Sequence, residues 1–212
     1  MITSASVALV DYGAGNLTSV SLALSHVGVS HVITRDPEVV RKADRIVFPG
    51  VGAAGASMDN IRAAGIDQAL TESVRKGTPL LGICIGCQIL LDRSEEDGGT
   101  DCLGILPGVV KRFDFDHLSE RPKIPHMGWN PVVFEGEHPV LAGIPTGAFF
   151  YFVHSFYPAP ERTEDILGRT TYGDLEFASI LARGNLVATQ FHAEKSGIHG
   201  LEILKNFAHW SP

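Results

Sequence analysis

The stretch that decides the fold is Thr78-Pro-Leu-Leu-Gly-Ile-Cys84-Ile-Gly-Cys-Gln-Ile-Leu-Leu91. Its first part is an apolar run typical of a buried strand, and its second part has the apolar spacing of a helix. A cysteine between the two, with Gly82 and Gly86 two residues to either side, predicts a nucleophile elbow, a sharp turn that exposes the reacting side chain. Cys84 would also lie at a helix N-terminus, where the helix dipole favours the reactive thiolate. The sequence therefore predicts an enzyme with a cysteine nucleophile.

Outward from this stretch, the first half of the chain alternates short β-type runs with helical patterns. This alternation is typical of a parallel sheet covered by helices. The expected strands are Ala5–Val10, His31–Thr34, Arg45–Phe48 and Pro79–Ile83, and the expected helices are Asn16–Val27, Glu38–Lys42, Ala54–Ala64, Ile66–Lys76 and Ile85–Arg93.

After a polar loop at Ser94–Thr100, the second half of the chain is richer in β-formers. Its expected strands, several of them antiparallel, are Gly104–Phe113, Pro131–Phe134, Phe149–Tyr157, Leu175–Ala182 and Leu186–His192, and a last helix is expected at Gly197–Trp210. We therefore predict one α/β domain over residues 1–212. Its central sheet would be mixed and mostly parallel, flanked by helices, with additional antiparallel strands in the second half.

Composition narrows the class of protein. The chain has 212 residues and a net charge of -7, which argues against binding nucleic acid or an anionic membrane through overall charge. The N-terminal segment resembles a first strand rather than a signal peptide, and no apolar run reaches the roughly 20 residues of a membrane helix. Three cysteines make a disulfide framework improbable. We expect a cytoplasmic protein that contacts neither nucleic acid nor membrane.

A cysteine nucleophile needs a general base, and the base needs an orienting group. The best candidates lie in Ala188-Thr-Gln-Phe-His192-Ala-Glu194-Lys-Ser196, at the end of an apolar run. If a strand continues through this stretch, residues two apart share a face, so His192 and Glu194 project to the same side. Glu194 would then hold one imidazole nitrogen while the other exchanges a proton with Cys84 and a leaving amine.

The glycine-rich segment Phe48-Pro-Gly50-Val-Gly52-Ala-Ala-Gly55 follows a predicted strand. Its backbone N–H groups, together with that of Ile85, would stabilise an oxyanion. The segment also satisfies Gly-x-Gly-x-x-Gly, a pattern typical of a dinucleotide or phosphate site. It follows the third predicted strand rather than the first, however, and Pro49 lies inside the turn. We therefore favour the oxyanion interpretation.

The segment Cys84-Ile-Gly-Cys87 is also a Cys-x-x-Cys sequence, which leaves two alternatives open. A redox or regulatory protein would use Cys87 as the resolving thiol. A structural zinc site would need further ligands, and only Cys102 and scattered histidines remain to supply them. Glycines on both flanks of Cys84 are required by an elbow and not by a dithiol.

Three motifs in this order resemble those of the class I, triad-type glutamine amidotransferases, and the resemblance spans nearly the whole chain. The motifs are Gly-Ile-Cys84-Ile-Gly-Cys-Gln88, Gln-Phe-His192-Ala-Glu194-Lys-Ser and Pro-Gly50-Val-Gly52. The resemblance implies hydrolysis of glutamine to glutamate and ammonia through a thioester, without a metal or organic cofactor.

The same resemblance assigns site residues one by one. It implies that Cys84 is the nucleophile, His192 the acid and base, Glu194 its orienting group, and Gly52 and Ile85 the oxyanion donors. The positions that match substrate-binding residues of the family are Gly50, Gln88, Glu96, His154 and Ser155. Two positions depart from the usual family pattern, because Ala193 replaces a common proline and Cys87 a common methionine.

Within the family, three further segments resemble the glutaminase subunits of imidazole glycerol phosphate synthases, which act in histidine biosynthesis. The segments are Asp11-Tyr-Gly-Ala-Gly-Asn16, Lys123-Ile-Pro-His-Met-Gly-Trp129-Asn130 and Tyr151-Phe-Val-His-Ser-Phe-Tyr157. This resemblance implies a heterodimer with a cyclase partner of (β/α)₈ barrel fold that receives the ammonia. The positions that match the surface facing the cyclase are Tyr12, Asn16, Trp129, Tyr151 and Lys195. A subunit of another synthase, of the anthranilate or aminodeoxychorismate type, remains the nearest alternative.

Overall fold

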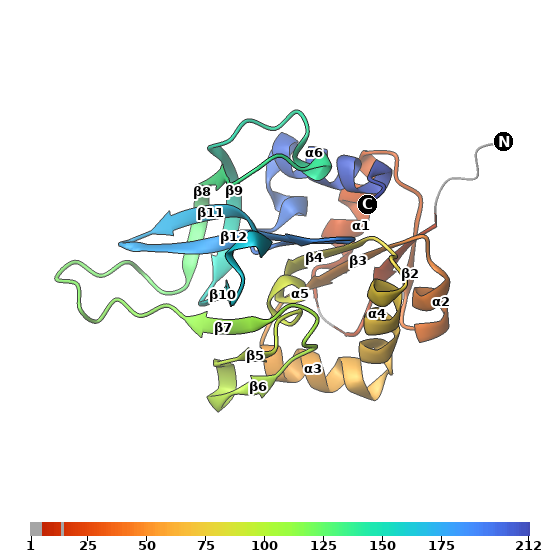
Figure 1. The fold of residues 1–212 in the computed structure, drawn as a ribbon, viewed down its shortest axis with the longest axis horizontal. Helices are drawn as coiled ribbons and strands as arrows, with labels where there is room; N and C mark the ends of the chain where they lie inside the picture. Colours follow the sequence, from red (N-terminus) through yellow and green to blue (C-terminus); the bar gives the residue numbers. More distant parts are fainter. Residues whose placement is uncertain (1–5, 14) are drawn as a thin grey trace.

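The computed structural model describes residues 6–13 and 15–212 and contains one large and one small sheet (Figure 1). The large sheet has nine strands, parallel in one half and antiparallel in the other. In spatial order they are β2 (His31–Thr34), β1 (Val7–Val10), β3 (Arg45–Gly50), β4 (Leu80–Cys84), β13 (Leu186–Thr189), β12 (Leu175–Arg183), β11 (Ile166–Tyr172), β8 (His126–Phe134) and β9 (Ala148–His154). The predicted mixed sheet is confirmed. Of the first predicted strand, Ala5 lies outside the described residues.

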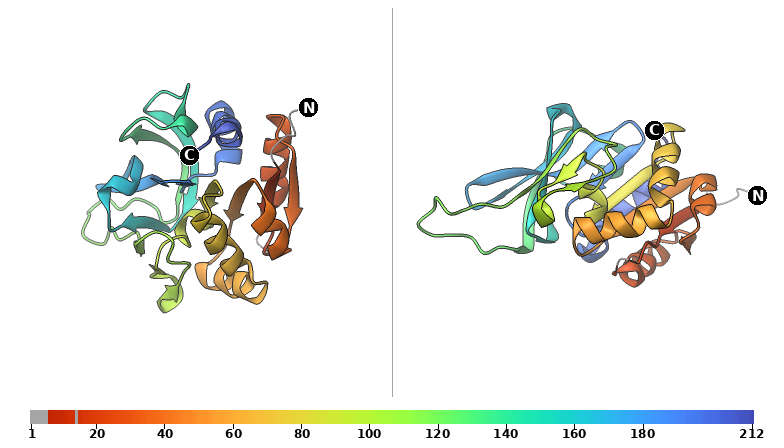
Figure 2. Two further views of the ribbon diagram at one scale, coloured as in Figure 1. Left: turned by 45° about the vertical axis from the view of Figure 1, so that its right-hand side comes forward. Right: turned by 90° about the horizontal axis from the view of Figure 1, so that it is seen from below.

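Helices cover both faces of the parallel half (Figures 1 and 2). One face carries α1 (Leu17–His26) and α6 (Gly197–His209), and the other carries α2 (Pro37–Lys42), α3 (Ala54–Ala63) and α4 (Ile66–Arg75). Because both faces are covered, β1, β4 and β13 are buried along their whole length, which explains their uninterrupted apolar sequences. None of the helices in residues 6–13 and 15–212 has the length and apolar character needed to span a membrane.

The small sheet contains the second part of a segment for which the sequence predicted a single long strand. Its order is β10 (Phe156–Pro160), β7 (Gly108–Arg112), β5 (Arg93–Ser94) and β6 (Thr100–Asp101). The predicted strand at 149–157 is therefore wrong as one unit, because β9 pairs with β8 in the large sheet and β10 pairs with β7 in the small one. The change of sheet occurs at Ser155, whose carbonyl accepts a bond from Phe113.

The helix after Cys84 is shorter than predicted, since α5 spans only Ile85–Gln88. In a longer helix, the carbonyls of residues 89–91 would accept bonds from the following turn. Here they accept from the backbone N–H groups of residues 103–106, with N–O distances of 2.9 Å. A distant segment thus ends the helix, and the helix dipole at Cys84 is correspondingly small.

Two strands of the antiparallel half also differ from the prediction. The strand β8 begins at His126 rather than at Pro131. Before residue 133 it pairs with β9 alone, because β11 pairs with it only at residues 133–134. A strand paired on one side tolerates proline, so Pro131 does not mark its start. The strand β11 was not predicted at all. Its pairing with β12 shifts register around Gly168, and such an irregularity hides the alternation that marks a strand.

Gly86 allows α5 to lie against β3, and replacing it with alanine tests this packing. A Cβ at position 86 would lie 1.9 Å from the carbonyl oxygen of Phe48, so the backbone of β3 would have to move. We expect Gly86→Ala to lower the free energy of unfolding by about 1–3 kcal/mol in urea titrations. Gly136→Ala is the matched control, because nothing lies within 4 Å of the added atom. Equal unfolding midpoints for the two variants would contradict the close approach.

Candidate functional site

Cys84 lies at the turn between β4 and α5 with φ 55° and ψ -109°, a strained backbone conformation for a residue with a side chain. The turn is tight because a Cβ at Gly82 would lie 2.7 Å from the carbonyl oxygen of Gly86. Beside it, Cys84 pairs with Gly50 at the end of β3. The predicted elbow is therefore present.

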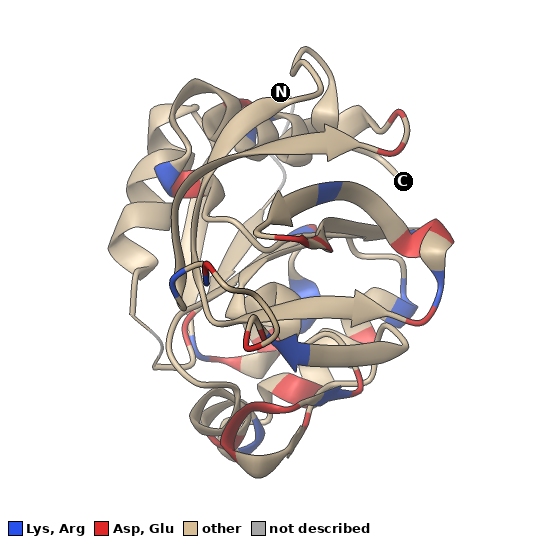
Figure 3. Cartoon of the chain, turned by 90° about the vertical axis from the view of Figure 1, so that its left-hand side faces the viewer, with Lys and Arg blue, Asp and Glu red and all other residues tan. Residues whose placement is uncertain are grey.

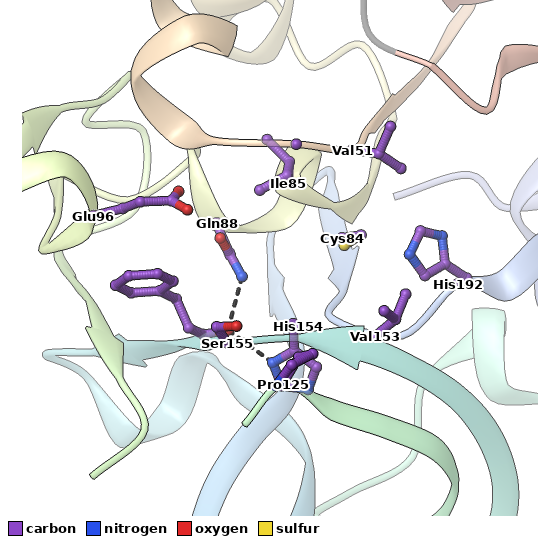
Figure 4. A pocket seen from close by; sticks show the side chains of 12 residues that line it. Val51, Cys84, Ile85, Gln88, Glu96, Pro125, Val153, His154, Ser155 and His192 are labelled. Carbon is purple, nitrogen blue, oxygen red and sulfur yellow. Dashed lines mark hydrogen bonds between the residues drawn. The ribbon is translucent and has the colours of Figure 1, made fainter. Parts of the chain in front are cut away.

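A cavity of about 290 Å³ opens beside the Cys84 sulfur (Figure 4). Residues singled out by the sequence make up most of its lining, namely Gly52, Cys84, Ile85, Gln88, Glu96, His154, Ser155 and His192. The sequence did not single out the remaining lining residues Val51, Pro125, Val153 and Phe156. All four lie inside segments quoted above for the resemblance, but none of them was assigned a role in the site.

His192 and Glu194 meet as predicted, although not on a strand. The imidazole Nδ1 lies 2.8 Å from Glu194 Oε1, and both side chains are almost completely buried. The strand β13 ends at Thr189, and Ala193–Lys195 form a turn of 3₁₀ helix. The backbone N–H of His192 bonds to the carbonyl of Tyr151 in β9, so the chain has left the ladder with β12. The turn, with alanine at position 193, brings the two side chains together.

The environment of His192 favours a protonated ring. Burial alone would lower its pKa, but interactions with Cys84 and Glu194 outweigh burial and raise the pKa to about 10. Its Nε2 is buried and has no partner at ordinary hydrogen-bond distance among the described residues. Figure 4 shows the ring beside Cys84 at the cavity. The group is placed to hold a proton next to the sulfur.

Asn16 contacts this pair from the start of α1. Its Nδ2 donates a hydrogen bond to Glu194 Oε1, the same oxygen that faces His192. Asn16 adopts a left-handed backbone conformation with φ 77°, which turns the chain into α1. The sequence resemblance placed Asn16 on a partner surface. In the structure it also forms part of the hydrogen-bonded group around Glu194.

Tyr12 and Gly50 differ from the sequence predictions. Tyr12 was expected on the partner surface, but its side chain is only 5% exposed and packs against Phe48. Gly50 was expected to bind substrate, but it does not line the cavity. A Cβ at Gly50 would lie 2.0 Å from the Tyr12 hydroxyl. The two residues therefore support the elbow by packing, because the Tyr12 ring fits against the backbone of Gly50, which has no side chain.

The far end of the cavity carries Gln88 and Glu96 (Figure 4). Gln88 is 2% exposed, its Nε2 donates to the Phe156 carbonyl at 2.8 Å, and its Oε1 is buried without a partner among the described residues. Glu96 Oε2 accepts a bond from the Ala54 N–H at 2.7 Å, and burial raises the pKa of its carboxyl group. A carboxylate and a free amide oxygen suit a ligand with an ammonium or amide group.

His154 lines the cavity, and its ring takes part in a buried network of hydrogen bonds. Its Nδ1 donates to the Phe156 carbonyl at 2.7 Å, so its Nε2 must accept from His126 Nδ1 at 3.0 Å. His126 Nε2 in turn accepts from Asn130 Nδ2 at 3.2 Å. Both rings are therefore neutral. Burial lowers the pKa of His126 to about 4 and that of His154 to about 3.

These two histidines predict a loss of stability in mild acid. Since an unfolded histidine has a pKa near 6.5, the unfolded chain binds more protons than the folded one between about pH 6.5 and pH 4. The free energy of unfolding should fall in this range by up to about 1.4 kcal/mol per pH unit for each ring. Urea titrations of His126→Asn should show a smaller slope. The exposed His209→Asn should keep the full slope, and a slope unchanged in His126→Asn would contradict the assignment.

Cys87 is fully buried behind the elbow, and burial raises the pKa of its thiol. A resolving thiol must become a thiolate that reaches its partner sulfur. Cys84 and Cys87 are both free in the structure. The burial of Cys87 thus counts against the redox alternative.

The remaining residues that the resemblance assigns to a partner surface are exposed or partly exposed, namely Trp129, Tyr151 and Lys195. Trp129 is 55% exposed and faces Tyr151 across β8 and β9, with ring centroids 6.1 Å apart. Lys195 is exposed directly after Glu194. The assignment of these residues to a partner surface stays a prediction.

Comparisons with known proteins show which family this chain resembles. The model of the family Glutamine amidotransferase class-I matches residues 8–210. The imidazole glycerol phosphate synthase subunit HisH of Pseudomonas syringae pv. syringae is 53% identical over 207 residues, 96% of this chain and 97% of the relative. The subunit of the same name from Dehalococcoides mccartyi is 47% identical over 201 residues, 95% of each chain.

Solved structures share the fold at lower identity. PurLQS of Thermotoga maritima superposes with a TM-score of 0.71 at 16% identity, covering 98% of this chain and 99% of the other. A structure described as a glutamine amidotransferase superposes with a TM-score of 0.70 at 22% identity, covering 96% of this chain and 99% of the other. The one-domain α/β architecture is common to all three.

Proposed function

The chain belongs to the class I glutamine amidotransferase family, and on this premise we propose that it is the glutaminase subunit of an imidazole glycerol phosphate synthase. The observation that carries the proposal is the meeting of an elbow cysteine, a buried His192–Glu194 pair and a cavity that ends at Glu96. The substrate is glutamine, and one amidotransferase domain over residues 1–212 holds the whole site.

The first half of the reaction forms a thioester. The Cys84 sulfur adds to the side-chain amide carbon of glutamine, and the carbonyl oxygen takes the negative charge. The backbone N–H groups of Gly52 and Ile85, at the cavity, are the proposed donors to that oxygen. His192 then gives its proton to the amide nitrogen, the carbon–nitrogen bond breaks and ammonia leaves. Glu194 stabilises the charged ring throughout.

The second half of the reaction releases glutamate. A water molecule enters where ammonia left, and His192 removes its proton as the oxygen adds to the thioester carbon. The carbon–sulfur bond breaks, which restores the Cys84 thiolate and the protonated ring. One glutamine and one water have become one glutamate and one ammonia.

The polar groups at the far end of the cavity would bind the glutamine backbone. The Glu96 carboxylate suits the α-ammonium group, and the unpartnered Gln88 Oε1 accepts a second N–H. His154 and Ser155 line the same cavity as Cys84. Recognition at one end thereby sets the side-chain amide beside the sulfur at the other.

A partner would dock on the outer face of β8 and β9. Neither strand carries a charged residue (Figure 3). On the solvent side of these strands Met127, Trp129, Val133 and Phe149 are each at least 55% exposed, and contiguous apolar exposure of this kind marks an interface. A Cβ at Gly197 would lie 3.8 Å from the Trp129 ring, so the segment after the triad borders the same face.

The proposed partner is a cyclase subunit with a (β/α)₈ barrel, in the cytoplasm. It would take the ammonia without release and combine it with a phosphoribulosyl-formimino aminoimidazole carboxamide ribonucleotide to give imidazole glycerol phosphate. Tyr151 and Lys195 border the apolar face. Asn16 connects Glu194 to the start of α1, which gives a short path from a bound partner to the triad.

Glutamate formation by the purified chain tests the proposal, first alone and then with an imidazole glycerol phosphate cyclase subunit and its ribonucleotide. We expect slow hydrolysis by the chain alone and strong stimulation in the mixture. Hydrolysis indifferent to this cyclase would point to another synthase. The absence of hydrolysis in both conditions would overturn the glutaminase assignment.

A further inference from the structure

Gln190 is a buried polar residue beside the nucleophile that none of the sequence motifs assigns to the chemistry. It follows β13 directly and is fully buried. Its backbone N–H bonds to the Ser179 carbonyl at 2.9 Å, which extends the ladder with β12 and fixes the Cα. Its side-chain Nε2 lies 3.9 Å from the Cys84 sulfur, within reach of a hydrogen bond to sulfur.

The direction of the Gln190 amide follows from its neighbours. The Phe156 carbonyl can only accept, so the group of Gln88 that faces it must be the NH₂. The second hydrogen of that NH₂ points to Gln190 at 2.9 Å, so the Gln190 atom there must be Oε1. Its NH₂ is then left to face Cys84. A backbone carbonyl thus determines, through two amides, that a donor meets the sulfur.

We propose that Gln190 is a positioning residue that donates an N–H to the Cys84 sulfur and stabilises its thiolate. The proposal rests on Cys84 being the nucleophile of the proposed glutaminase. Because α5 has only four residues, its helix dipole stabilises a thiolate only weakly. A fixed amide donor supplies the stabilisation that the dipole of a longer helix would give. The relay also passes through Gln88, which lines the proposed glutamine cavity, so substrate binding and sulfur reactivity share one hydrogen-bonded chain.

The other groups around the Cys84 sulfur are titratable side chains, and none of them is an amide N–H donor like that of Gln190. His192 and Glu194 approach from one side, and His192 interacts with Cys84. Burial raises the pKa of the Tyr12 hydroxyl and that of the Cys87 thiol. On the cavity side are two further groups, Glu96 and the neutral His154. A change at Gln190 leaves all of them in place.

The test is the pH dependence of Cys84 alkylation by iodoacetamide, followed on the Cys84 peptide by mass spectrometry. Gln190→Glu keeps the shape and the bond to Gln88 but replaces the donor with an acceptor. Gln190→Leu removes the donor and the bond to Gln88 together. The matched control is Gln68→Leu, at an exposed glutamine on α4.

We expect the alkylation midpoint to rise by about one pH unit in Gln190→Glu, by less in Gln190→Leu, and not at all in the control. If Gln190 had a purely structural role, the midpoint would shift more in Gln190→Leu than in Gln190→Glu. An unchanged midpoint in Gln190→Glu would overturn the proposal. The readout does not require turnover. If Gln190→Glu shifts the midpoint while the unmodified chain hydrolyses no glutamine, alone or with the cyclase, the glutaminase assignment is refuted and the role of Gln190 is left intact.

Discussion

Cys84→Ser lowers glutamine hydrolysis by about four orders of magnitude or more, as expected when the nucleophile of a triad enzyme is replaced by a poorer one. A serine hydroxyl does not ionise near neutral pH, so the variant lacks an anionic nucleophile. It also lacks the interaction with Cys84 that helps to raise the pKa of His192. The measurement is glutamate release by the complex with the cyclase, at saturating glutamine. Binding of glutamine should change little, because the far end of the cavity is untouched.

Cys87→Ala separates this result from the redox alternative. Cys87 is fully buried behind the elbow and does not line the cavity, so its removal creates a small void without touching the reacting atoms. We expect hydrolysis within a factor of about two of the unmodified chain, with a slightly lower free energy of unfolding. Equal losses in both variants would favour a dithiol and contradict the mechanism.

Trp129→Ala should weaken binding of the cyclase by about 30-fold to 1000-fold while leaving the free chain folded. A half-exposed tryptophan at the centre of an apolar face has the character of an interface hot spot, and truncation of such residues costs about 2–4 kcal/mol. Titration calorimetry with the cyclase measures the loss. Hydrolysis by the free chain should not change.

Leu22→Ala is the control for that experiment. Leu22 is 66% exposed on α1 and is at least as apolar, but it lies away from β8 and β9. Its replacement should leave the affinity for the cyclase unchanged. If both variants bind the cyclase as tightly as the unmodified chain, the face formed by β8 and β9 is not the docking surface.

The parallel half of the sheet and the elbow could be predicted because their determinants are local. Continuous apolar runs mark strands that are covered on both faces, and Gly82 and Gly86 mark a turn whose backbone has no room for a Cβ. The pairing of His192 with Glu194 was also predicted, although on the assumption of a strand. A spacing of two residues brings side chains together in more than one backbone conformation.

The rest depends on contacts between segments far apart in sequence. Neither the end of α5 nor the change of sheet at Ser155 has a local signal, because the partners that cause them lie at residues 103–106 and at Phe113. The burial of Tyr12 depends on Gly50 in the same way. Gln190 opens the quoted His192 motif but was assigned no role, because its role depends on which atoms surround its amide.

The strained backbone at Cys84 sets folding against chemistry at a single position. Glycine adopts φ 55° without strain, whereas a residue with a side chain costs about 1–3 kcal/mol there. A protein that no longer needs the reaction would therefore gain stability if glycine replaced Cys84. Under the proposed mechanism, only reactivity repays this strain, and glycine at this position would mark a copy that has kept the fold and given up catalysis.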